Sequence, residues 1–252
     1  MKKYIALALG IFFCSVSFSQ QTYYAAAKAG LSMRDQPNTS AKVLEKIAYG
    51  EKLVTVADNT QPVAISTEGF NGFWYKVKYK EKTGYIVSSY TLPLPPPKAG
   101  TKELQDYFAQ VSAANGSALV IKRAVPGLEE TGESTLTKQL YKNGMEWHKA
   151  QGYEYGSDLY MLPGFSIEQA YLLVRLIGQY PDLITDKDGF PTKNSIIKNN
   201  TGNKTFEVDK EKNGSGPGWI KKIKIILEQG AITEFEIFML DEQAVIFWSS
   251  GV

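Results

Sequence analysis

Hydrophobic and polar residues alternate in short runs along the first third of the chain, and turn residues separate the runs. A long polar segment at 58–72 interrupts the pattern and is expected to be a loop. Alternation with a period of two is typical of half-buried strands, and short strands joined by glycine-containing turns favour a small β-barrel. Residues 22–92 are therefore predicted to be all-β. The predicted strands are 43–47, 53–56, 73–79 and 85–87.

Alternation along the predicted aromatic strand at 73–79 indicates which of its residues point into the core. Alternation places Trp74 on one face and Tyr75 and Val77 on the other. We expect Tyr75 and Val77 to point into the core and Trp74 to be partly exposed.

A proline-rich segment at 93–100 follows the all-β region. Consecutive prolines fix φ and lack backbone donors, so this segment cannot continue a sheet or a helix. Because patterned sequence flanks it on both sides, a short, stiff linker is the favoured interpretation. Pro93 and Pro96 also have the P-x-x-P spacing that can dock on an aromatic groove, and that alternative stays open.

Two helices are predicted in residues 101–252. The first begins at Thr101 and ends at Asn115-Gly116, and its apolar residues recur at i, i+3, i+4 and i+7. The second begins with the capping box Ser166–Gln169, ends at Gly178 and is apolar nearly all round, which predicts deep burial. The apolar residues of the first helix are Leu104, Tyr107, Phe108 and Val111.

The rest of this region has strand patterns joined by short turns, of which Asn143-Gly144 is the strongest hairpin signal. Consecutive hairpins form an antiparallel meander, so residues 101–252 are predicted to be an α+β domain with two helices on the sheet. A weak α-β-β-β duplication is conceivable, although no residue-level repeat supports it. The predicted strands are 118–121, 135–142, 145–151, 195–198, 204–208, 219–227, 232–240 and 244–248.

The N-terminus has the pattern of a secretory signal peptide at residues 1–19. Lys2 and Lys3 precede an apolar run at 4–16 that is too short for a comfortable bilayer span, and small residues follow it. Cys14 raises the alternative of a lipoprotein, but the bulky Phe13 before it disfavours lipidation. The sequence therefore predicts export to the periplasm or the exterior.

Charge and residue counts narrow the possible functions. The chain has 28 Lys and Arg against 26 Asp and Glu, and removal of Lys2 and Lys3 with the leader leaves a formal charge of zero. A neutral chain is a poor candidate for nucleic-acid binding. Because Cys14 is the only cysteine and His148 the only histidine, we expect no disulfide, thiolate nucleophile, cysteine-bound metal or cofactor.

Several short motifs match catalytic or ion-binding patterns but lack the required context. Ser195–Lys198 and Lys82–Gly84 match S-x-x-K and K-T-G of penicillin-recognising enzymes, in reversed order and in different predicted domains. Asp186–Gly189 lacks two ligand oxygens of a calcium loop and is interpreted as a turn. The glycine-rich segment 214–218 has no P-loop lysine and is expected to be a loop.

Two groups of ionisable residues are candidates for catalysis. His148 shares a strand face with Glu146, so a general base oriented by an acid is conceivable, although a solvated strand face is the favoured interpretation. The acids Glu129, Glu130 and Glu133 cluster in a predicted loop. Two carboxylates can hydrolyse a glycan, but nothing in the sequence pairs any two of these.

Residues 22–92 resemble bacterial SH3-like domains, because several motifs of that family occur here in the same order. The segment Gly30–Pro37 stands where the family has a Leu-Asn-Val-Arg stretch followed by proline, and Val43-Leu44 and Gly50-Glu51 follow. The family then closes on a Trp-Tyr-x-Val strand and a glycine hairpin, matched by Trp74–Val77 and Thr83–Ile86. The segment 88–92 resembles the usual end of the domain.

This resemblance implies a groove that presents aromatic faces to extended peptides or glycan-linked peptides. It favours an exported, non-catalytic protein that binds cell-wall peptide or an envelope protein partner. One alternative is a cell-envelope hydrolase with paired carboxylates in 101–252 and the SH3-like domain for targeting. Another is a C-terminal sheet that covers a partner with its exposed face. The candidate ligand-binding residues are Tyr49, Phe73, Trp74, Tyr85 and Tyr90. Tyr75 is a further aromatic residue of the same region, but it is expected to point into the core.

Overall fold

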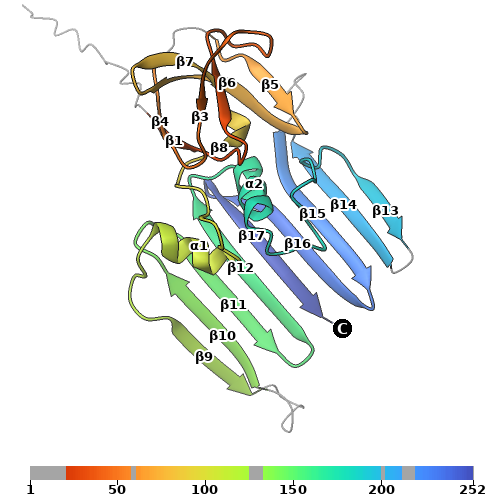
Figure 1. The fold of residues 1–252 in the computed structure, drawn as a ribbon. Helices are drawn as coiled ribbons and strands as arrows, with labels where there is room; N and C mark the ends of the chain where they lie inside the picture. The colour runs from red at the N-terminus through yellow and green to blue at the C-terminus, as the bar shows by residue number, and fades with distance from the viewer. Residues whose placement is uncertain (1–20, 58–60, 125–132, 200–201, 212–218, 252) are drawn as a thin grey trace, which may run out of the picture.

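The structure is a computed structural model, and it consists of two antiparallel sheets with two α-helices in its described part (Figure 1). The predicted signal peptide lies outside the described residues. None of the helices in this part of the chain is long and apolar enough to cross a membrane. The structure describes residues 21–57, 61–124, 133–199, 202–211 and 219–251.

The N-terminal sheet has the strand order β3-β2-β7-β6-β4-β1-β8, and β5 pairs with β6. Its core consists of buried Leu31, Met33, Ile47, Leu53 and Ile86, among others. The described strands show no pairing between the outer strands β3 and β8, so the closed barrel stays a prediction. The elements are β1 (Thr22–Ala25), β2 (Leu31–Arg34), β3 (Val43–Ile47), β4 (Lys52–Thr55), β5 (Ala64–Thr67), β6 (Phe70–Tyr79), β7 (Lys82–Val87), the 3-10 helix η1 (Ser88–Tyr90) and β8 (Thr91–Leu92).

The predicted loop at 58–72 is wrong over most of its described part, because β5 and the start of β6 form a hairpin there. The two residues between the strands, Glu68 and Gly69, have φ of 52° and 82°. Two consecutive positive φ values are typical of the tight turn that suits the twist of a hairpin. Sequence reasoning missed it because Ala64–Thr67 has only one large apolar residue, Ile65, and because Glu68 is an unusual residue at such a turn position.

The prediction that Trp74 is partly exposed is also wrong, since only 6% of it is accessible. The inward position of Val77 is confirmed, and Tyr75 is half-buried beside Tyr23. The ten-residue β6 buries Phe70 and Trp74 near its start and Val77 near its end. By alternation along the strand, Phe70 and Trp74 lie on the face of β6 opposite to Val77, and Phe70 and Val77 belong to different cores.

The C-terminal sheet has nine strands in the order β13-β14-β15-β16-β17-β12-β11-β10-β9. Every neighbouring pair is antiparallel, which confirms the predicted meander and the two helices. The elements are α1 (Leu104–Val111), β9 (Leu119–Ala124), β10 (Glu133–Leu140), β11 (Glu146–Gly152), β12 (Tyr155–Pro163), α2 (Ile167–Ile177), β13 (Ser195–Asn199), β14 (Gly202–Glu211), β15 (Trp219–Gln229), β16 (Ala231–Leu240) and β17 (Gln243–Gly251).

The C-terminal sheet consists of two similar halves. Each half is a helix followed by a meander, and the last strands of the two meanders, β12 and β17, pair at the centre. The halves have four and five strands rather than three. Strand β12 was not predicted, because Gly156, Asp158 and Pro163 weaken its strand pattern. Pairing with β11 and β17 on both sides overrides this local preference.

The two helices match their predicted apolar faces, and the ends of α2 match as well. Ser166 and Gln169 form the capping box, and Gly178 ends α2 with a left-handed φ of 73°. The predicted ends of α1 were wrong, since it begins after Glu103 and ends at Val111. Instead of extending the helix, the Asn115 N–H donates to Leu140 O at 2.8 Å and joins the edge of the sheet.

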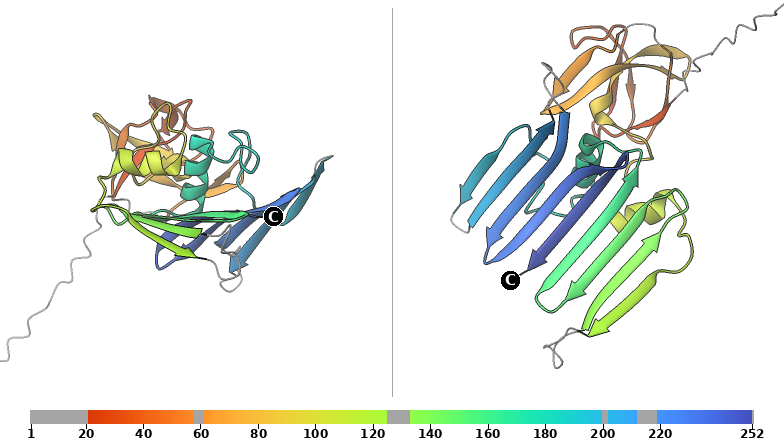
Figure 2. Two further views of the ribbon diagram at one scale, coloured as in Figure 1. Left: turned by 90° about the horizontal axis from the view of Figure 1, so that it is seen from below. Right: turned by 180° about the vertical axis from the view of Figure 1, so that it is seen from behind.

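Both helices and the N-terminal sheet lie on one face of the C-terminal sheet (Figure 2). None of the described elements covers the opposite face, where ion pairs such as Lys222–Glu236 lie on neighbouring strands. A protein partner resting on that face stays a prediction.

The two sheets share one hydrophobic core across the proline-rich segment. Phe70 and Leu92 from the N-terminal part belong to the same buried cluster as Tyr171 and Phe190 from the C-terminal part. Pro96 and Pro97 are buried, and the Tyr49 O–H donates to Pro97 O at 2.8 Å. The segment is therefore packed against its surroundings, and the division of the chain into domains stays a prediction.

Candidate functional site

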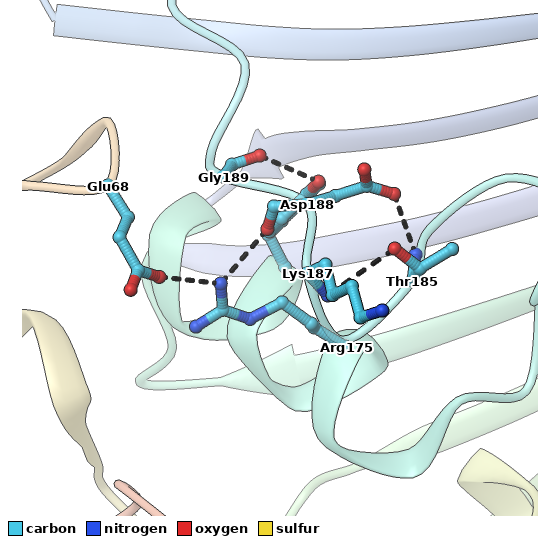
Figure 3. Close-up of polar contacts among 7 residues, drawn as sticks. Glu68, Arg175, Thr185, Lys187, Asp188 and Gly189 are labelled. Atoms are coloured by element: carbon cyan, nitrogen blue, oxygen red, sulfur yellow. Dashed lines mark hydrogen bonds and ion pairs between the residues drawn. The ribbon is translucent and has the colours of Figure 1, made fainter.

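A buried arginine on α2 fastens the β5–β6 turn to the C-terminal sheet. The Arg175 guanidinium donates from Nη1 to Glu68 Oε2 at 3.0 Å and to Asp188 O at 2.9 Å (Figure 3). It also lies 4.8 Å from the centre of the Phe70 ring. The Phe190 N–H donates to Glu68 O at 2.8 Å. These contacts hold the two sheets in a fixed relation.

The charge of Glu68 is stabilised by this arrangement. Hydrogen bonds from Arg175 and Tyr90 hold the pKa of the Glu68 carboxyl below its usual value, and the Arg175 charge adds to the effect. Gly69 beside it has no room for a side chain, since an added Cβ would collide with Phe190 O. The turn is thus matched closely to the C-terminal residues that it contacts.

A groove of about 1110 Å³ lies next to this junction, and we call it the interdomain groove. One wall consists of β5, β6 and η1, and the other consists of the start of α2 and the adjoining ends of β14, β15 and β16. Its aromatic residues are Tyr23, Phe73, Tyr75, Phe165 and Trp219.

Two neighbouring serines form part of the groove beside Gly72. The Ser88 hydroxyl accepts a hydrogen bond from Phe73 N at 2.9 Å. Ser89 is only 5% exposed, and its Oγ has no hydrogen-bond partner among the described residues. A Cβ added at Gly72 would lie 2.5 Å from Ser89 Oγ and 2.7 Å from Ser88 Oγ. The lack of a side chain at Gly72 therefore leaves room for both hydroxyl groups. An unsatisfied buried hydroxyl is costly unless a ligand or water completes its bonding.

The lining of the groove is mostly apolar in area, includes many polar side chains and carries little charge. Its charged residues are Glu168, Lys210 and Glu242. Serine, threonine, asparagine and glutamine supply its other polar side chains. This combination of aromatic faces and uncharged hydrogen-bonding groups suits an extended, nearly neutral ligand. Its remaining polar residues are Ser66, Asn71, Ser88, Ser89, Ser166, Gln169 and Thr192.

The five predicted ligand-binding residues do not share one surface. Phe73 is 44% exposed and lines the groove, whereas Trp74 is buried. Tyr49 packs on the proline-rich segment, where burial raises its pKa to about 12. Tyr85 lies near Lys76, with 5.8 Å between the ammonium and the ring centre. Tyr90 packs against both cores. Ligand binding by these five residues stays a prediction.

Sequence reasoning missed most of the groove. Trp219 is half exposed at the start of β15, and a tryptophan beside a glycine-rich segment was a weak sign of a binding surface. The Tyr23 ring packs against Tyr75 with 5.5 Å between ring centres and a tilt of 35°, and the Tyr23 pKa is raised to about 12, mainly by burial. Nothing in the local sequence marked Ser89.

His148 and Glu146 do form the predicted pair, with 2.9 Å between Nε2 and Oε2. Lys138 Nζ lies 2.7 Å from the same carboxylate oxygen. Burial alone would raise the Glu146 pKa, but hydrogen bonds from Lys138 and His148 hold it below its usual value. The carboxylate is therefore engaged by two side chains on a sheet face and does not line the groove.

The remaining sequence candidates form ordinary structural elements or lie outside the described residues. Ser195–Lys198 lies in strand β13, as predicted. At Asp186–Gly189 the Asp188 carboxylate accepts from Thr185 N at 2.8 Å and closes a turn. Glu133 pairs with Lys122 at 3.2 Å. Glu129, Glu130 and residues 214–218 are not described. Within the described ranges, no group of three or more histidine and acidic residues could hold a metal ion.

The N-terminal strands form a β-rich region that packs against an α+β sheet. Residues 29–91 match the family model of the bacterial SH3 domain. This match confirms the resemblance found in the sequence, and it is confined to the N-terminal sheet. No curated protein and no solved structure matches the chain significantly.

Proposed function

We propose that this protein is an exported, non-catalytic binding protein that holds an extended segment of cell-wall peptide in the interdomain groove. Bacterial SH3 domains typically bind cell-wall components, and the predicted signal peptide is in keeping with that location. An envelope protein segment with the same extended shape is the other candidate ligand for the same groove.

The observation that carries this proposal is the groove itself. Both sheets contribute to it, and the Arg175 contacts fix their relation. Ser89 Oγ supplies an unsatisfied hydrogen-bonding group, and Phe73 and Trp219 supply exposed aromatic faces. Strand β5, which lines the groove, pairs only with β6 among the described strands. Its other edge can therefore add an extended peptide by main-chain hydrogen bonds.

The alternative function, an envelope hydrolase, has weaker support. Burial raises the pKa of Asp158, as expected for a general acid. The second carboxylate of the same small hollow, Glu154, lies in the turn before β12, and the three-residue step from Tyr155 to Asp158 along the strand alone spans roughly 10 Å. Glycosidases place their two carboxyl groups roughly 5–9.5 Å apart. A hydrolase at this position would need a different acid pair.

The test is a peptide titration followed by NMR of the tryptophan indole N–H signals, with a cell-wall stem pentapeptide as the probe. The chain has four tryptophans, and Trp219 is the one that lines the groove. We expect the Trp219 signal to shift. Phe73→Ala and Trp219→Ala should each weaken binding by about 5- to 50-fold, as for exposed aromatic anchors.

Tyr153→Ala is the matched control, because Tyr153 is an equally exposed aromatic residue that does not line the groove. It should leave the affinity unchanged. The proposal is wrong if neither the pentapeptide nor isolated sacculi bind, or if both groove variants bind as well as the wild type. Release of soluble fragments from sacculi, lost in Asp158→Asn, would establish the hydrolase instead.

A further inference from the structure

A second hollow of about 460 Å³ lies on the helix-bearing face of the C-terminal sheet, around Trp248 and Asp158. We call it the Trp248 hollow. It lies at the end of β12 and β17 that is remote from the N-terminal sheet (Figure 1). The other residues that line it include Lys149, Gln151, Gly156, Ala231 and Ser250.

The strand register explains how the hollow forms. Lys149, Asp158 and Trp248 lie in one row across β11, β12 and β17, so their side chains share a face. Gln151, Gly156 and Ser250 form the next row outward. Because Gly156 has no side chain, the middle of the outer row is empty, and the space beside Trp248 and Asp158 remains open.

The polar groups of the hollow are available to a ligand. Asp158 is only 9% exposed, and its Oδ1 accepts a hydrogen bond from Trp147 Nε1 at 2.9 Å. Its Oδ2 has no hydrogen-bond partner within the described part of the chain. The same holds for the side chains of Lys149 and Gln151. Burial raises the Asp158 pKa, and the hydrogen bond from Trp147 and the charge of Lys149 oppose this shift. The carboxylate can still accept a hydrogen bond from a ligand in the hollow.

Trp248 offers a flat apolar surface beside these groups. Its indole stacks on Tyr180, with 6.0 Å between ring centres and 18° between planes. This stacking fixes the orientation of the indole, which packs partly against the core and partly lines the hollow. Asp158 accepts hydrogen bonds, Lys149 donates them, and Gln151 and Ser250 do both.

We propose that the Trp248 hollow binds a sugar ring. A saccharide has an apolar face of C–H groups that stacks on an indole, and hydroxyl groups that both donate and accept hydrogen bonds around its rim. The hollow offers one aromatic face with adjacent acceptors and donors in this arrangement. This site is separate from the interdomain groove and gives the C-terminal sheet a binding role of its own.

Gly156 provides a sharp test, because a side chain there fills the hollow without disturbing the fold. An added Cβ would have only the Trp248 ring within 4 Å, at 3.9 Å, and the backbone does not have a positive φ. Gly156→Val should therefore fold with an unchanged or higher melting temperature, since valine suits a strand. It should reduce saccharide binding at least tenfold. Ser249→Val is the matched control, because Ser249 lies on the opposite face of the sheet.

The measurement is an NMR titration of the purified protein with three trisaccharides: the trimer of N-acetylglucosamine, cellotriose and maltotriose. At least one trimer should shift the Trp248 and Trp147 indole signals and leave the Trp219 signal in place. Asp158→Asn keeps an acceptor for Trp147 and should weaken binding about 10- to 100-fold through loss of a charged acceptor.

The proposal is overturned if none of the three trisaccharides shifts the Trp248 signal at 20 mM. It is also overturned if Gly156→Val binds as the wild type does. The Trp219 signal reports the interdomain groove separately, so failure of saccharide binding and failure of peptide binding are distinguishable.

Discussion

Replacement of Arg175 by methionine should destabilise the whole protein, because this side chain joins the two sheets. Arg175 is nearly buried, and three kinds of contact are lost together. The bond to Asp188 O is charge-assisted and worth about 1.5–3 kcal/mol. The contact with Phe70 is worth about 0.5–2 kcal/mol, part of which methionine replaces through its sulfur.

The ion pair with Glu68 adds less than its short distance suggests. The Glu68 side chain is more than half exposed, so solvent screens the pair and its contribution is at most about 1 kcal/mol. We expect Arg175→Met to lower the free energy of unfolding by about 2–4 kcal/mol. For a chain of this size, that corresponds to a fall in Tm of about 5–15 °C.

The assay is thermal and urea unfolding followed by circular dichroism and tryptophan fluorescence. Because one core cluster joins the two sheets, both signals should report a single transition in the wild type. Lys221→Gln removes an exposed ion pair with Glu211 and is the control, with a change within about 0.5 kcal/mol. An Arg175→Met protein as stable as this control would refute the role of Arg175.

The pH dependence follows from the lowered pKa of Glu68. A carboxyl with a lowered pKa in the folded state contributes stability above its unfolded pKa of about 4.3, and this is lost as the pH falls through the folded value. The stability difference between wild type and Glu68→Gln should therefore be present at pH 7 and disappear in acid, below about pH 4. A difference that grows in acid would contradict this assignment.

Two further substitutions test local features. Gly69→Ala should lower stability by at least about 1–3 kcal/mol in urea unfolding, because φ is 82° and the new Cβ would collide with Phe190 O; a neutral effect would show that the turn is not held there. Ser166→Ala removes the hydroxyl that accepts from Gln169 N at 3.2 Å, and should cost about 0.5–2 kcal/mol, while Ser166→Asp should retain most of the stability.

Local signals allowed accurate prediction where the structure is set by neighbours in sequence. The capping box at Ser166–Gln169 and the left-handed Gly178 define both ends of α2 within the helix itself. The Asn143-Gly144 hairpin was predicted for the same reason, and Gly144 has a φ of 85°. In each case the stabilising hydrogen bonds lie within a few residues of the signal.

Elements that depend on distant partners could not be predicted. Strand β12 contains glycine, aspartate and proline, yet it lies at the centre of the sheet because β11 and β17 pair with it on both sides. The burial of Trp74 and Phe70 on one side of β6 depends on packing that the N-terminal pattern alone does not reveal.

The groove was missed for a related reason, since residues from separate parts of the chain form it. Tyr23, Phe73, Ser89, Gln169 and Trp219 come from different elements, and only the packing of the two sheets brings them together. The resemblance to bacterial SH3 domains identified the correct region but not this surface, because one of its walls belongs to the C-terminal sheet.

Strand β16 connects the two proposed binding sites and sets a scale for the ligand. Ala231 lines the Trp248 hollow and Met239 lines the interdomain groove, so the sites are eight residues apart on one strand face. At about 3.3 Å per residue, the separation is roughly 26 Å. A short fragment can therefore occupy only one site, whereas a polymer that carries peptide and sugar can reach both and bind more tightly by effective concentration.

We expect sacculi to bind at least tenfold more tightly than either fragment, and Gly156→Val or Trp219→Ala alone to remove this advantage. Equal affinities for polymer and fragments would show that the two sites do not act together.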